Sequence, residues 1–463
     1  MLRWGAMQII DPATDQLLEE VVEDTESSVR EKAAASRKAQ RAWAARPLAE
    51  RAAILRRFRE LLVARSGPLA MTLTSEVGKP ISQSRNEISG LLGRIDFFLE
   101  HVATEVAPEV VHQEAGLEER ISHEPLGVIA NISAWNYPYF VGGNVFLPAL
   151  LTGNAVLYKP SEFSTLSGLA IAKLLHDAGV PEAVFTPLIG GPAVGKALLD
   201  TRISGLFFTG SYATGQAIAR RVAPQMMKLQ FELGGKDPVY VTEDIDVPSV
   251  AADVADGAFY NTGQSCCAVE RIYVHERIWD EFLAAFVATV RGFVLGNPRE
   301  KNTYIGALAR RKPALELLQA HTDDALSRGA KLELGGKRAD RPGWFFEPTV
   351  FSAADHSMRL MREESFGPII GLTKVSSDEQ GLELMRDTEY GLTAAVYTRD
   401  RGRAERLLSE VEVGSAYWNC CDRVSPRLPW SGRNHSGIGA TLSSYGIETF
   451  LQPKAWHFRA PAA

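Results

Sequence analysis

The alternation of short apolar runs with helical segments between residues 127 and 241 constrains the fold of this chain most. The apolar runs are rich in Val, Ile, Leu and Phe, and segments of helical periodicity such as residues 167–178 separate most of them. Apolar strands that alternate with helices form βαβ units around a mostly parallel sheet that is covered on both faces. We therefore expect an α/β fold with strands at residues 127–132, 155–158, 185–189, 205–209 and 238–241.

The length of the chain and a second alternating region indicate more than one packed unit. A chain of 463 residues is too long for a single hydrophobic core, so two or three units are expected. The second alternating region runs from about residue 270 to residue 420, with strand candidates at residues 271–274, 369–372 and 394–397. A second α/β unit is therefore expected to follow the first.

Three segments lie outside the two alternating regions. Residues 26–66 and 85–104 carry apolar residues at helical spacing, with a break predicted at Pro47. Residues 108–126 predict a hairpin, and residues 452–458 predict a single strand near the C-terminus. A lone strand needs a sheet to join, and a partner subunit could provide one.

Two unusual runs carry the residues with the strongest chemical signal. Residues 260–267 contain Cys266 and Cys267 beside a glycine and an amide, where a thiolate could reach a bound electrophile. Residues 231–236 place Glu232 among apolar residues and glycines. A nucleophile and a candidate base in such settings point to covalent catalysis. Taken alone, a cysteine is more often inert packing and a glutamate is more often solvated.

Composition and charge exclude several classes of protein. The 50 basic and 56 acidic residues give a formal net charge of −6, which argues against a nucleic-acid-binding surface. No apolar stretch approaches the ~20 residues of a membrane span, and the first residues lack the apolar run of a signal peptide. The four cysteines form two adjacent pairs and the nine histidines are scattered, so no metal site is expected. So few cysteines in a large chain favour a reducing compartment, and we expect the cytoplasm.

Polar residues follow several of the predicted strands, where ligands bind in open α/β sheets. Asn136 could donate a hydrogen bond from its amide, and Lys159 and Glu162 could reach ribose hydroxyls. Gly210 and Ser211 would place backbone N–H groups at a helix N-terminus, where a phosphate binds well. Each motif alone also admits a plainer interpretation: an Asx-turn at Asn136, a solvated loop after Lys159, and a simple turn at Gly210.

Two further motifs are weak when they stand alone. Residues 190–197 nearly match a phosphate-binding P-loop, but Ala197 stands where a magnesium-binding Ser or Thr is required. We interpret this segment as a turn that opens a helix. Residues 363–368 place two carboxylates and an aromatic residue before a turn, which by itself predicts a loop at a helix end.

Together, these segments resemble the NAD(P)-dependent aldehyde dehydrogenase superfamily. The resemblance begins at residues 11–14 and continues to the C-terminal strand, so it covers nearly the whole chain. The runs that carry it, in order, are residues 77–80, 135–138, 159–162, 208–211, 232–236, 263–266, 364–368 and 436–439.

The resemblance implies an aldehyde-dehydrogenase-like α/β fold with three regions. A Rossmann-type cofactor domain would comprise residues 1–106 and 126–236. An α/β catalytic domain would comprise residues 237–435. Residues 107–125 and 436–463 would form a β oligomerisation arm in a homodimer or homotetramer.

The resemblance also implies roles for individual residues. Cys266 would be the nucleophile, Glu232 the general base, and Asn136 would complete an oxyanion hole with the backbone N–H of Cys266. Lys159 and Glu162 would hold the adenosine ribose, and Ser211 would contact the pyrophosphate. Glu364 would hold the nicotinamide ribose, with Phe366 beside the nicotinamide. The full implied cofactor site is Trp135, Lys159, Glu162, Gly210, Ser211, Glu364 and Phe366.

These roles predict oxidation of a small-molecule aldehyde to its carboxylic acid. Cys266 would form a thiohemiacetal, hydride loss would leave a thioacyl enzyme, and Glu232 would activate the water that releases the acid. Burial among apolar neighbours should raise the pKa of Glu232 towards neutrality. We expect NAD as the cofactor, because Glu162 would repel the 2′-phosphate of NADP, although side-chain rotation leaves NADP as an alternative.

The substrate cannot be read from these motifs. Residues 439–441 read Gly-Ala-Thr where the family usually carries Gly-Arg-Glu, near the subunit interface and the substrate entrance. Arg423 or Arg427 could bind a substrate carboxylate, as in a semialdehyde, although a solvated arginine is the plainer interpretation. The residues predicted to line the substrate pocket are Tyr137, Val141, Tyr260, Ser265, Asp422, Arg423 and Trp430.

Two alternative functions predict different residues or products. A non-catalytic binding or structural relative on the same fold would have lost Cys266, Glu232 or Asn136, and all three are present. A relative that transfers the acyl group to coenzyme A usually lacks the glutamate found here as Glu232. The identity of the product, acid or acyl thioester, would separate these alternatives.

Overall fold

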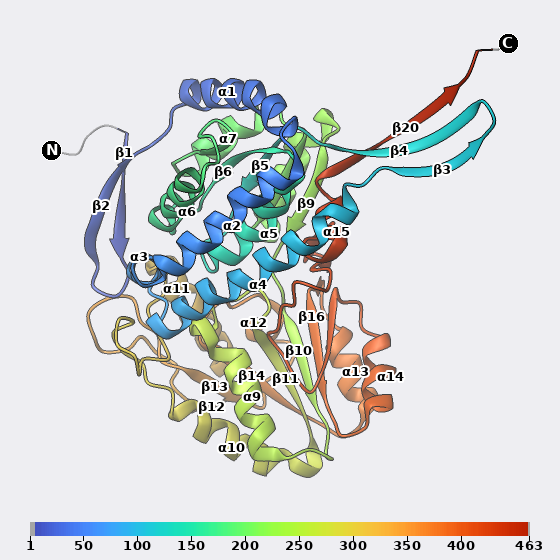
Figure 1. The fold of residues 1–463 in the computed structure, drawn as a ribbon. Helices are drawn as coiled ribbons and strands as arrows, with labels where there is room; N and C mark the ends of the chain where they lie inside the picture. The colour runs from blue at the N-terminus through green and yellow to red at the C-terminus, as the bar shows by residue number, and fades with distance from the viewer. Residues whose placement is uncertain (1–4, 462–463) are drawn as a thin grey trace.

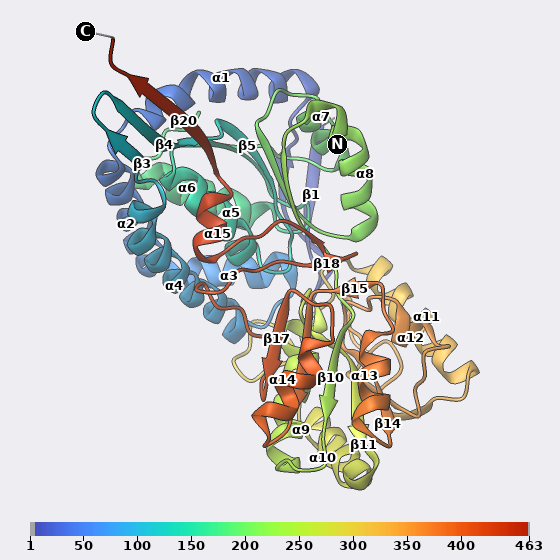
Figure 2. The ribbon, with the colours of Figure 1, turned by 90° about the vertical axis from the view of Figure 1, so that its right-hand side faces the viewer.

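The fold has two α/β units and an arm that projects from the first of them (Figures 1 and 2). We describe it from a computed structural model, in which residues 5–461 are placed. The α/β class predicted from the sequence is confirmed.

The first unit is built on a six-stranded sheet with the order β19-β9-β8-β5-β6-β7. Its strands β5 to β9 are parallel, and β19 pairs antiparallel with β9. Strand order reverses at β5, because the next strand along the chain lies on one side of it and β8 lies on the other. Such a reversal opens a crevice at the carboxyl ends of the two strands, as in Rossmann folds. The strands are β5 (Val128–Ile132), β6 (Ala155–Lys159), β7 (Phe185–Pro187), β8 (Gly205–Thr209), β9 (Lys228–Glu232) and β19 (Gly437–Ile438).

Helices pack on both faces of this sheet, and the predicted break at Pro47 is confirmed (Figure 1). The first helix begins with a capping box, in which the Thr25 side chain accepts from the Ser28 N–H. Buried residues of α2, α4 and α5 join those of β5 and β6 in one apolar core. The helices are α1 (Glu26–Ala44), α2 (Leu48–Ala64), α3 (Ser66–Val77), α4 (Ile81–Glu105), α5 (Pro138–Leu151), α6 (Thr165–Ala178), α7 (Pro192–Leu199), α8 (Tyr212–Val222) and α15 (Ser443–Glu448).

The second unit is built on a seven-stranded sheet with the order β12-β13-β14-β11-β10-β16-β17. Neighbours are parallel except β12 and β13. Successive residues of β10 face opposite cores: Val239 and Val241 join one apolar cluster and Tyr240 joins the other. The strands are β10 (Asp237–Val241), β11 (Val269–His275), β12 (Lys331–Leu334), β13 (Thr349–Ser352), β14 (Ile369–Val375), β16 (Thr393–Tyr397) and β17 (Ser415–Trp418).

Helices cover both faces of the second sheet as well (Figure 2). They are α9 (Val247–Phe259), α10 (Trp279–Arg291), α11 (Lys312–Ser327), α12 (Arg359–Arg362), α13 (Asp378–Arg386) and α14 (Arg401–Ser409). Short 3₁₀ segments occur at Ala223–Gln225, Tyr260–Gly263 and Glu276–Ile278. Two small antiparallel pairs of strands also form: β1 (Ala6–Asp11) with β2 (Gln16–Val22), and β15 (Tyr390–Gly391) with β18 (Arg433–Asn434).

The projecting arm is a three-stranded antiparallel sheet with the order β20-β4-β3 (Figure 1). The predicted hairpin forms β3 (Glu109–Glu114) and β4 (Leu117–Pro125), and the predicted terminal strand forms β20 (Leu451–Arg459). Strand β20 therefore finds its sheet within the same chain, on β4.

The C-terminal segment joins the arm later than the expected boundary at residue 436. Strand β19 pairs with β9 of the first sheet, and α15 packs against α4 and α5. The φ of Gly437 is +138°, and a Cβ there would lie 2.1 Å from the carbonyl oxygen of Phe231. Glycine thus lets the segment cross the first unit before it enters the arm at Leu451.

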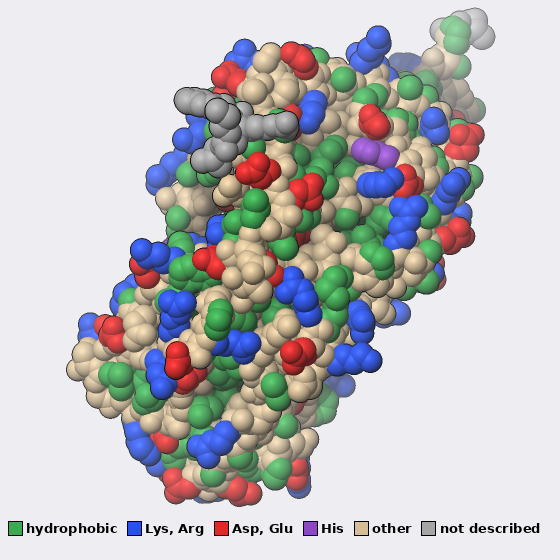
Figure 3. Space-filling model, turned by 90° about the vertical axis from the view of Figure 1, so that its left-hand side faces the viewer, with side chains coloured by type: hydrophobic (Ala, Val, Ile, Leu, Met, Phe, Trp, Pro, Cys, Tyr) green, Lys and Arg blue, Asp and Glu red, His purple; other side chains and the backbone are tan. Residues whose placement is uncertain are grey.

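The surface carries charges of both signs. Acidic and basic side chains are interspersed on the face shown in Figure 3. Between residues 5 and 461, no helix is both long and apolar enough to cross a bilayer.

Candidate active site

The loop that carries Cys266 begins with a sharp left-handed turn. Asn261, Thr262 and Gly263 have φ values of +53°, +62° and +69°. A Cβ on Gly263 would lie 2.2 Å from the carbonyl oxygen of Gly367, so only glycine fits there without displacing the backbone. The turn connects α9 to β11 and leaves Cys266 half-buried at the edge of a cleft.

Side-chain amides hold this loop in place. The Gln264 side chain accepts a hydrogen bond from the Ala309 N–H at 3.0 Å. The Gln264 carbonyl accepts from the Asn261 amide at 2.9 Å and from the Asn136 amide at 3.2 Å. Asn136, which follows β5, is thereby brought beside the loop of Cys266.

The two adjacent cysteines have different environments. Cys266 lines the cleft, whereas Cys267 is buried and its thiol donates to Asp422 at 3.0 Å. The neighbouring Cys266, burial and the Asp422 carboxyl together raise the pKa of Cys267 well above its ordinary value. Cys267 therefore stays a thiol at neutral pH, and Cys266 is the thiol that faces the cleft. Both cysteines are free.

Glu232 lies at the end of β9 and is buried. Its Oε1 accepts hydrogen bonds from the Thr441 hydroxyl and, at 3.4 Å, from the Gln230 amide. Burial raises the pKa of Glu232 to about 7, while the Thr441 hydroxyl, the positive charge of Arg94 and the Gln230 amide oppose the shift. The direction predicted from its apolar neighbours is confirmed, and such a carboxyl can exchange protons near neutral pH.

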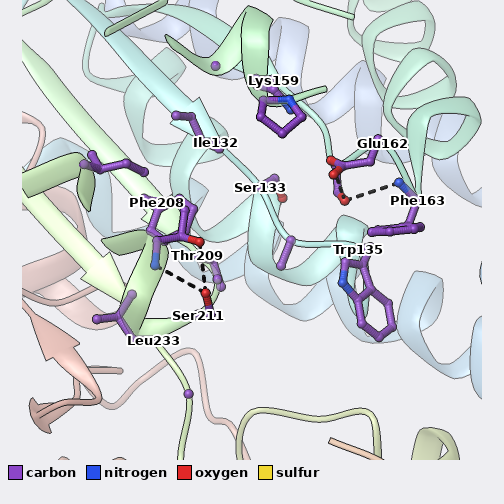
Figure 4. A pocket seen from close by; sticks show the side chains of 18 of the residues that line it. Ile132, Ser133, Trp135, Lys159, Glu162, Phe163, Phe208, Thr209, Ser211 and Leu233 are labelled. Atoms are coloured by element: carbon purple, nitrogen blue, oxygen red, sulfur yellow. Dashed lines mark hydrogen bonds between the residues drawn. The ribbon is translucent and has the colours of Figure 1, made fainter. Parts of the chain in front are cut away.

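The cleft has a volume of about 690 Å³ and extends from the crevice between β5 and β8 to Cys266. Glu162, Phe163 and Trp135 lie on one side of it, and Ser211 and Leu233 on the other (Figure 4). Cys266, Asn136 and all seven residues expected to bind the cofactor line it: Trp135, Lys159, Glu162, Gly210, Ser211, Glu364 and Phe366. Glu232 is not part of the lining and is followed by Leu233, which is.

At the end of the cleft nearest β6, a lysine and a carboxylate lie close together. Burial lowers the pKa of Lys159, and the negative charge of Glu162 opposes this. Helix α8 begins on the opposite side of the cleft, where the Ser211 hydroxyl accepts from the Thr214 N–H at 3.4 Å. The P-loop-like segment does open a helix, α7, as interpreted from the sequence, and its Lys196 also lines the cleft.

At the other end, a buried ion pair fixes the turn after Glu364. Glu270 pairs with Lys236 and accepts from the backbone N–H groups of Ser365 and Phe366 at 3.0 and 3.1 Å. Sequence reasoning missed Glu270 and Lys236. The adjacent charged residues Glu270 and Arg271 between the apolar residues of β11 were the available signal for Glu270.

Glu364 itself faces the glycines that follow β9. Its Oε1 accepts from the Gly235 N–H at 3.2 Å, and a Cβ on Gly234 would lie 2.5 Å from the same carboxyl. Burial, and then the charge of Glu270, raise the pKa of Glu364 to about 8. Glycine at position 234 is therefore needed for this carboxyl to approach the strand end.

The residues expected to line the substrate pocket do not line this cleft. Tyr137, Ser265 and Asp422 cluster around Cys267. The Ser265 hydroxyl donates to Asp422 at 3.4 Å, and the charge of Asp422 acts on the Tyr137 phenol. Burial raises the pKa of Asp422 to about 7, opposed mainly by the Cys267 thiol. These groups form a polar region next to Cys266, separate from the cleft.

The other predicted pocket residues are spread more widely. Val141 and Trp430 are buried, and the Tyr260 hydroxyl accepts from the Asn86 amide at 3.2 Å. The Arg423 side chain is exposed and lies 3.8 Å from Asp253, an arrangement typical of a solvated surface arginine.

Comparisons with known proteins identify the family of the chain. The Aldehyde dehydrogenase family profile matches residues 3–456. The succinate-semialdehyde dehydrogenase [NADP(+)] of Deinococcus radiodurans is 34% identical over 417 residues, which are 90% of this chain and 87% of that protein.

Solved structures give the same result. A succinate-semialdehyde dehydrogenase from Burkholderia pseudomallei is 34% identical, with a TM-score of 0.95 over 98% of this chain and 95% of its own. PnpE in complex with nicotinamide adenine dinucleotide is 30% identical, with a TM-score of 0.96 over 99% and 95%. The chain therefore belongs to the aldehyde dehydrogenase family.

Proposed function

We propose that this chain oxidises an aldehyde to its carboxylic acid with a nicotinamide dinucleotide, through a covalent intermediate on Cys266. One observation carries the proposal: Cys266 and Asn136 line the same cleft as the expected cofactor residues, and Glu232 immediately precedes Leu233 of that lining. Nucleophile, oxyanion donor and base then surround one reacting carbon.

The cleft fits a dinucleotide in its position, its charge and its donors. It lies at the reversal of strand order in the first sheet and has a volume of about 690 Å³. Free N–H groups at the start of α8 would bind the pyrophosphate. Glu162 and Glu364 would accept hydrogen bonds from the two riboses, because a carboxyl group has acceptor oxygens whether or not it is ionised.

The first step is attack of the Cys266 thiolate on the aldehyde carbon. A C–S bond forms and the carbonyl oxygen becomes an oxyanion. The Asn136 amide gives one N–H to the Gln264 carbonyl and has a second N–H for that oxyanion. A donor of this kind stabilises the transition state by roughly 3–4 kcal/mol.

When bound, the nicotinamide supplies the hydride acceptor that an aldehyde carbon requires. Loss of the hydride leaves a thioacyl group on Cys266. Glu232 then takes a proton from water, and the hydroxide attacks the thioacyl carbon. The C–S bond breaks, the acid leaves and the Cys266 thiolate is restored. A pKa of about 7 leaves Glu232 partly ionised at neutral pH, as a base for this step must be.

We also propose NAD as the preferred cofactor, with NADP as the alternative. Glu162 lines the cleft near Lys159, and its charge would repel a 2′-phosphate. Lys196 and Arg221 line the same cleft and would attract that phosphate, so the balance between them and Glu162 decides the preference.

We also propose roles for the two units and an oligomeric state. The first unit, residues 1–106 and 126–236, would bind the cofactor, and residues 237–435 would carry the nucleophile. The arm exposes Val110, Val111 and Phe458, and we infer that a second copy of the chain covers them in a homodimer or homotetramer. The four free cysteines fit the reducing cytoplasm.

A panel of aldehydes tests the activity. The purified chain with NAD should reduce the cofactor and release the carboxylic acid, both with and without coenzyme A. An acyl thioester as the main product would favour the acyl-transferring alternative. Absence of turnover with every aldehyde would favour a binding protein.

Deletion of the hairpin at residues 109–125 should lower the mass of the assembly in light scattering.

A further inference from the structure

Arg94 is a buried guanidinium without an ionic partner. Its side chain lies on α4 and is 5% exposed. The Nε atom is fully buried and has no hydrogen-bond partner, and the guanidinium forms no ion pair with any residue that the structure describes. Burial lowers the pKa of Arg94 only to about 10, so it is charged at neutral pH.

The other two buried arginines show what a satisfied guanidinium looks like in this chain. Arg51 donates to the Leu151 carbonyl at 2.9 Å and to further carbonyls. Arg271 donates to the Lys236 carbonyl at 2.8 Å and to three more backbone oxygens. A buried charge destabilises the fold unless it is paired and hydrogen-bonded. Arg94, whose N–H donors have no partner among the described residues, therefore differs from the other two buried arginines.

Nearby carboxylates do not fill this vacancy. Glu87 lies about two turns earlier on α4, but one of its oxygens pairs with Lys79 at 2.5 Å and the other accepts from the Tyr139 N–H at 2.9 Å. Glu232 is within electrostatic reach of Arg94, yet its hydrogen bonds come from Thr441 and Gln230. Arg94 thus adds positive charge beside the site without being neutralised in direct contact.

Arg94 lies within electrostatic reach of Cys267 and Glu232. Its guanidinium stacks on the Phe140 ring, with Cζ 3.7 Å from the ring centroid, and Phe140 stacks on Tyr137 in turn. The expected cofactor residues line the cleft that Cys266 borders. With the cofactor in that cleft, the tail of a bound aldehyde would extend away from it, towards Cys267 and the stacked rings of Tyr137 and Phe140.

We propose that Arg94 binds an anionic group at the far end of the substrate, and that the preferred substrates are aldehydes carrying a carboxylate. This inference rests on the proposed aldehyde oxidation and specifies its substrate class. A planar guanidinium held on an aromatic ring presents paired N–H donors to a carboxylate. The bound carboxylate would supply the partner that Arg94 lacks within the chain.

The test compares two aldehydes of equal length, one with a terminal carboxylate and one without: succinate semialdehyde and butanal. Wild type should have the higher kcat/KM for the carboxylated aldehyde. Arg94→Met keeps the side-chain volume similar and should lower the ratio of the two kcat/KM values ~100-fold, mainly through KM of the carboxylated substrate. Arg94→Lys keeps the charge but loses the planar fork, so its ratio should fall less.

Two controls make the result specific. Arg85→Met changes an exposed arginine on the same helix and should leave the ratio as in wild type. Competitive inhibition of butanal oxidation by succinate should occur in wild type and weaken at least ~10-fold in Arg94→Lys, which gives a readout if Arg94→Met fails to fold.

Each contrary outcome has a distinct meaning. Equal losses for both aldehydes would show that Arg94 only positions Glu232, and this would overturn the inference. Loss of the preference in Arg423→Met but not in Arg94→Met would assign the anion to the surface arginine instead. If the wild-type enzyme oxidises butanal and shows no preference for the carboxylated aldehyde, the inference is refuted and the proposed function stands. If neither aldehyde nor any other is oxidised, the proposed function itself fails.

Discussion

Replacing Thr441 by valine tests how the C-terminal segment controls Glu232. The Thr441 hydroxyl donates to Glu232 Oε1, and after burial it has the largest influence on the pKa of that carboxyl. Valine has a similar shape but no donor. Because the lost hydrogen bond stabilised the carboxylate and not the carboxylic acid, the pKa of Glu232 must rise.

The expected size of the change follows from the hydrogen bond. A hydrogen bond to a charged group contributes roughly 1.5–3 kcal/mol. One pKa unit corresponds to ~1.4 kcal/mol, so the pKa of Glu232 should rise by about 1–2 units. Starting from about 7, the ionised fraction at pH 7 would fall from roughly a half to between ~1/10 and ~1/100. Deacylation at pH 7 should therefore slow about 5- to 50-fold.

Pre-steady-state kinetics separate this effect from a loss of acylation. Thr441→Val should keep the initial burst of reduced cofactor, because Cys266 and Asn136 are unchanged. Its steady-state kcat should fall at pH 7 and recover towards wild type near pH ~10. Thr449→Val is the matched control, since the Thr449 hydroxyl donates to the Ala440 carbonyl and not to Glu232. If the acidic limb of the pH–kcat profile of Thr441→Val lay at the same pH as in wild type, this account of Glu232 would be refuted.

Three other substitutions have outcomes that the structure specifies. Cys266→Ser should lower kcat at least ~1,000-fold, because a hydroxyl is far less acidic than a thiol, whereas Cys267→Ser should retain turnover; cofactor reduction measures both. Glu162→Gln removes a negative charge from the cofactor cleft and should raise the ratio of kcat/KM for NADP over NAD ~10-fold; an unchanged ratio would mean that Glu162 does not select the cofactor. Gly263→Ala should destabilise the fold by about 2 kcal/mol or more, because φ is +69° and a Cβ would meet backbone; Gly93→Ala, which meets no atom within 4 Å, should not lower the melting temperature.

The sequence predicted the sheet strands that are continuous apolar runs and the polar residues that follow them. Strands β5, β6 and β8 are of this kind, and Asn136 and Ser211 follow β5 and β8 in the chain. Strand β9 was missed because only Leu229 and Phe231 are apolar between Lys228 and Glu232. Local hydrophobic patterns therefore predicted strands made of consecutive apolar residues. They did not predict β9, which contains polar residues that become buried only through packing against other segments.

Long-range placement was beyond prediction from local patterns. The pairing of β19 with β9 joins residues that lie far apart in the chain, and no local signal marks it. Arg94 also gives no signal in the sequence, because an arginine beside Ile95 and Asp96 in a helix would ordinarily face solvent. Its guanidinium is covered by Phe140 of α5.

Both of these unpredicted features act on Glu232. Burial alone would keep that carboxyl protonated well above neutral pH, which would leave no base for hydrolysis of a thioacyl group. The Thr441 hydroxyl, carried in by the segment after β19, and the Arg94 charge, carried by α4, both favour the ionised form. A substrate carboxylate on Arg94 would cancel part of that charge and raise the pKa of Glu232 while the substrate is bound. Deacylation of a carboxylated substrate should therefore have its acidic limb at higher pH than deacylation of butanal, and this difference should vanish in Arg94→Met.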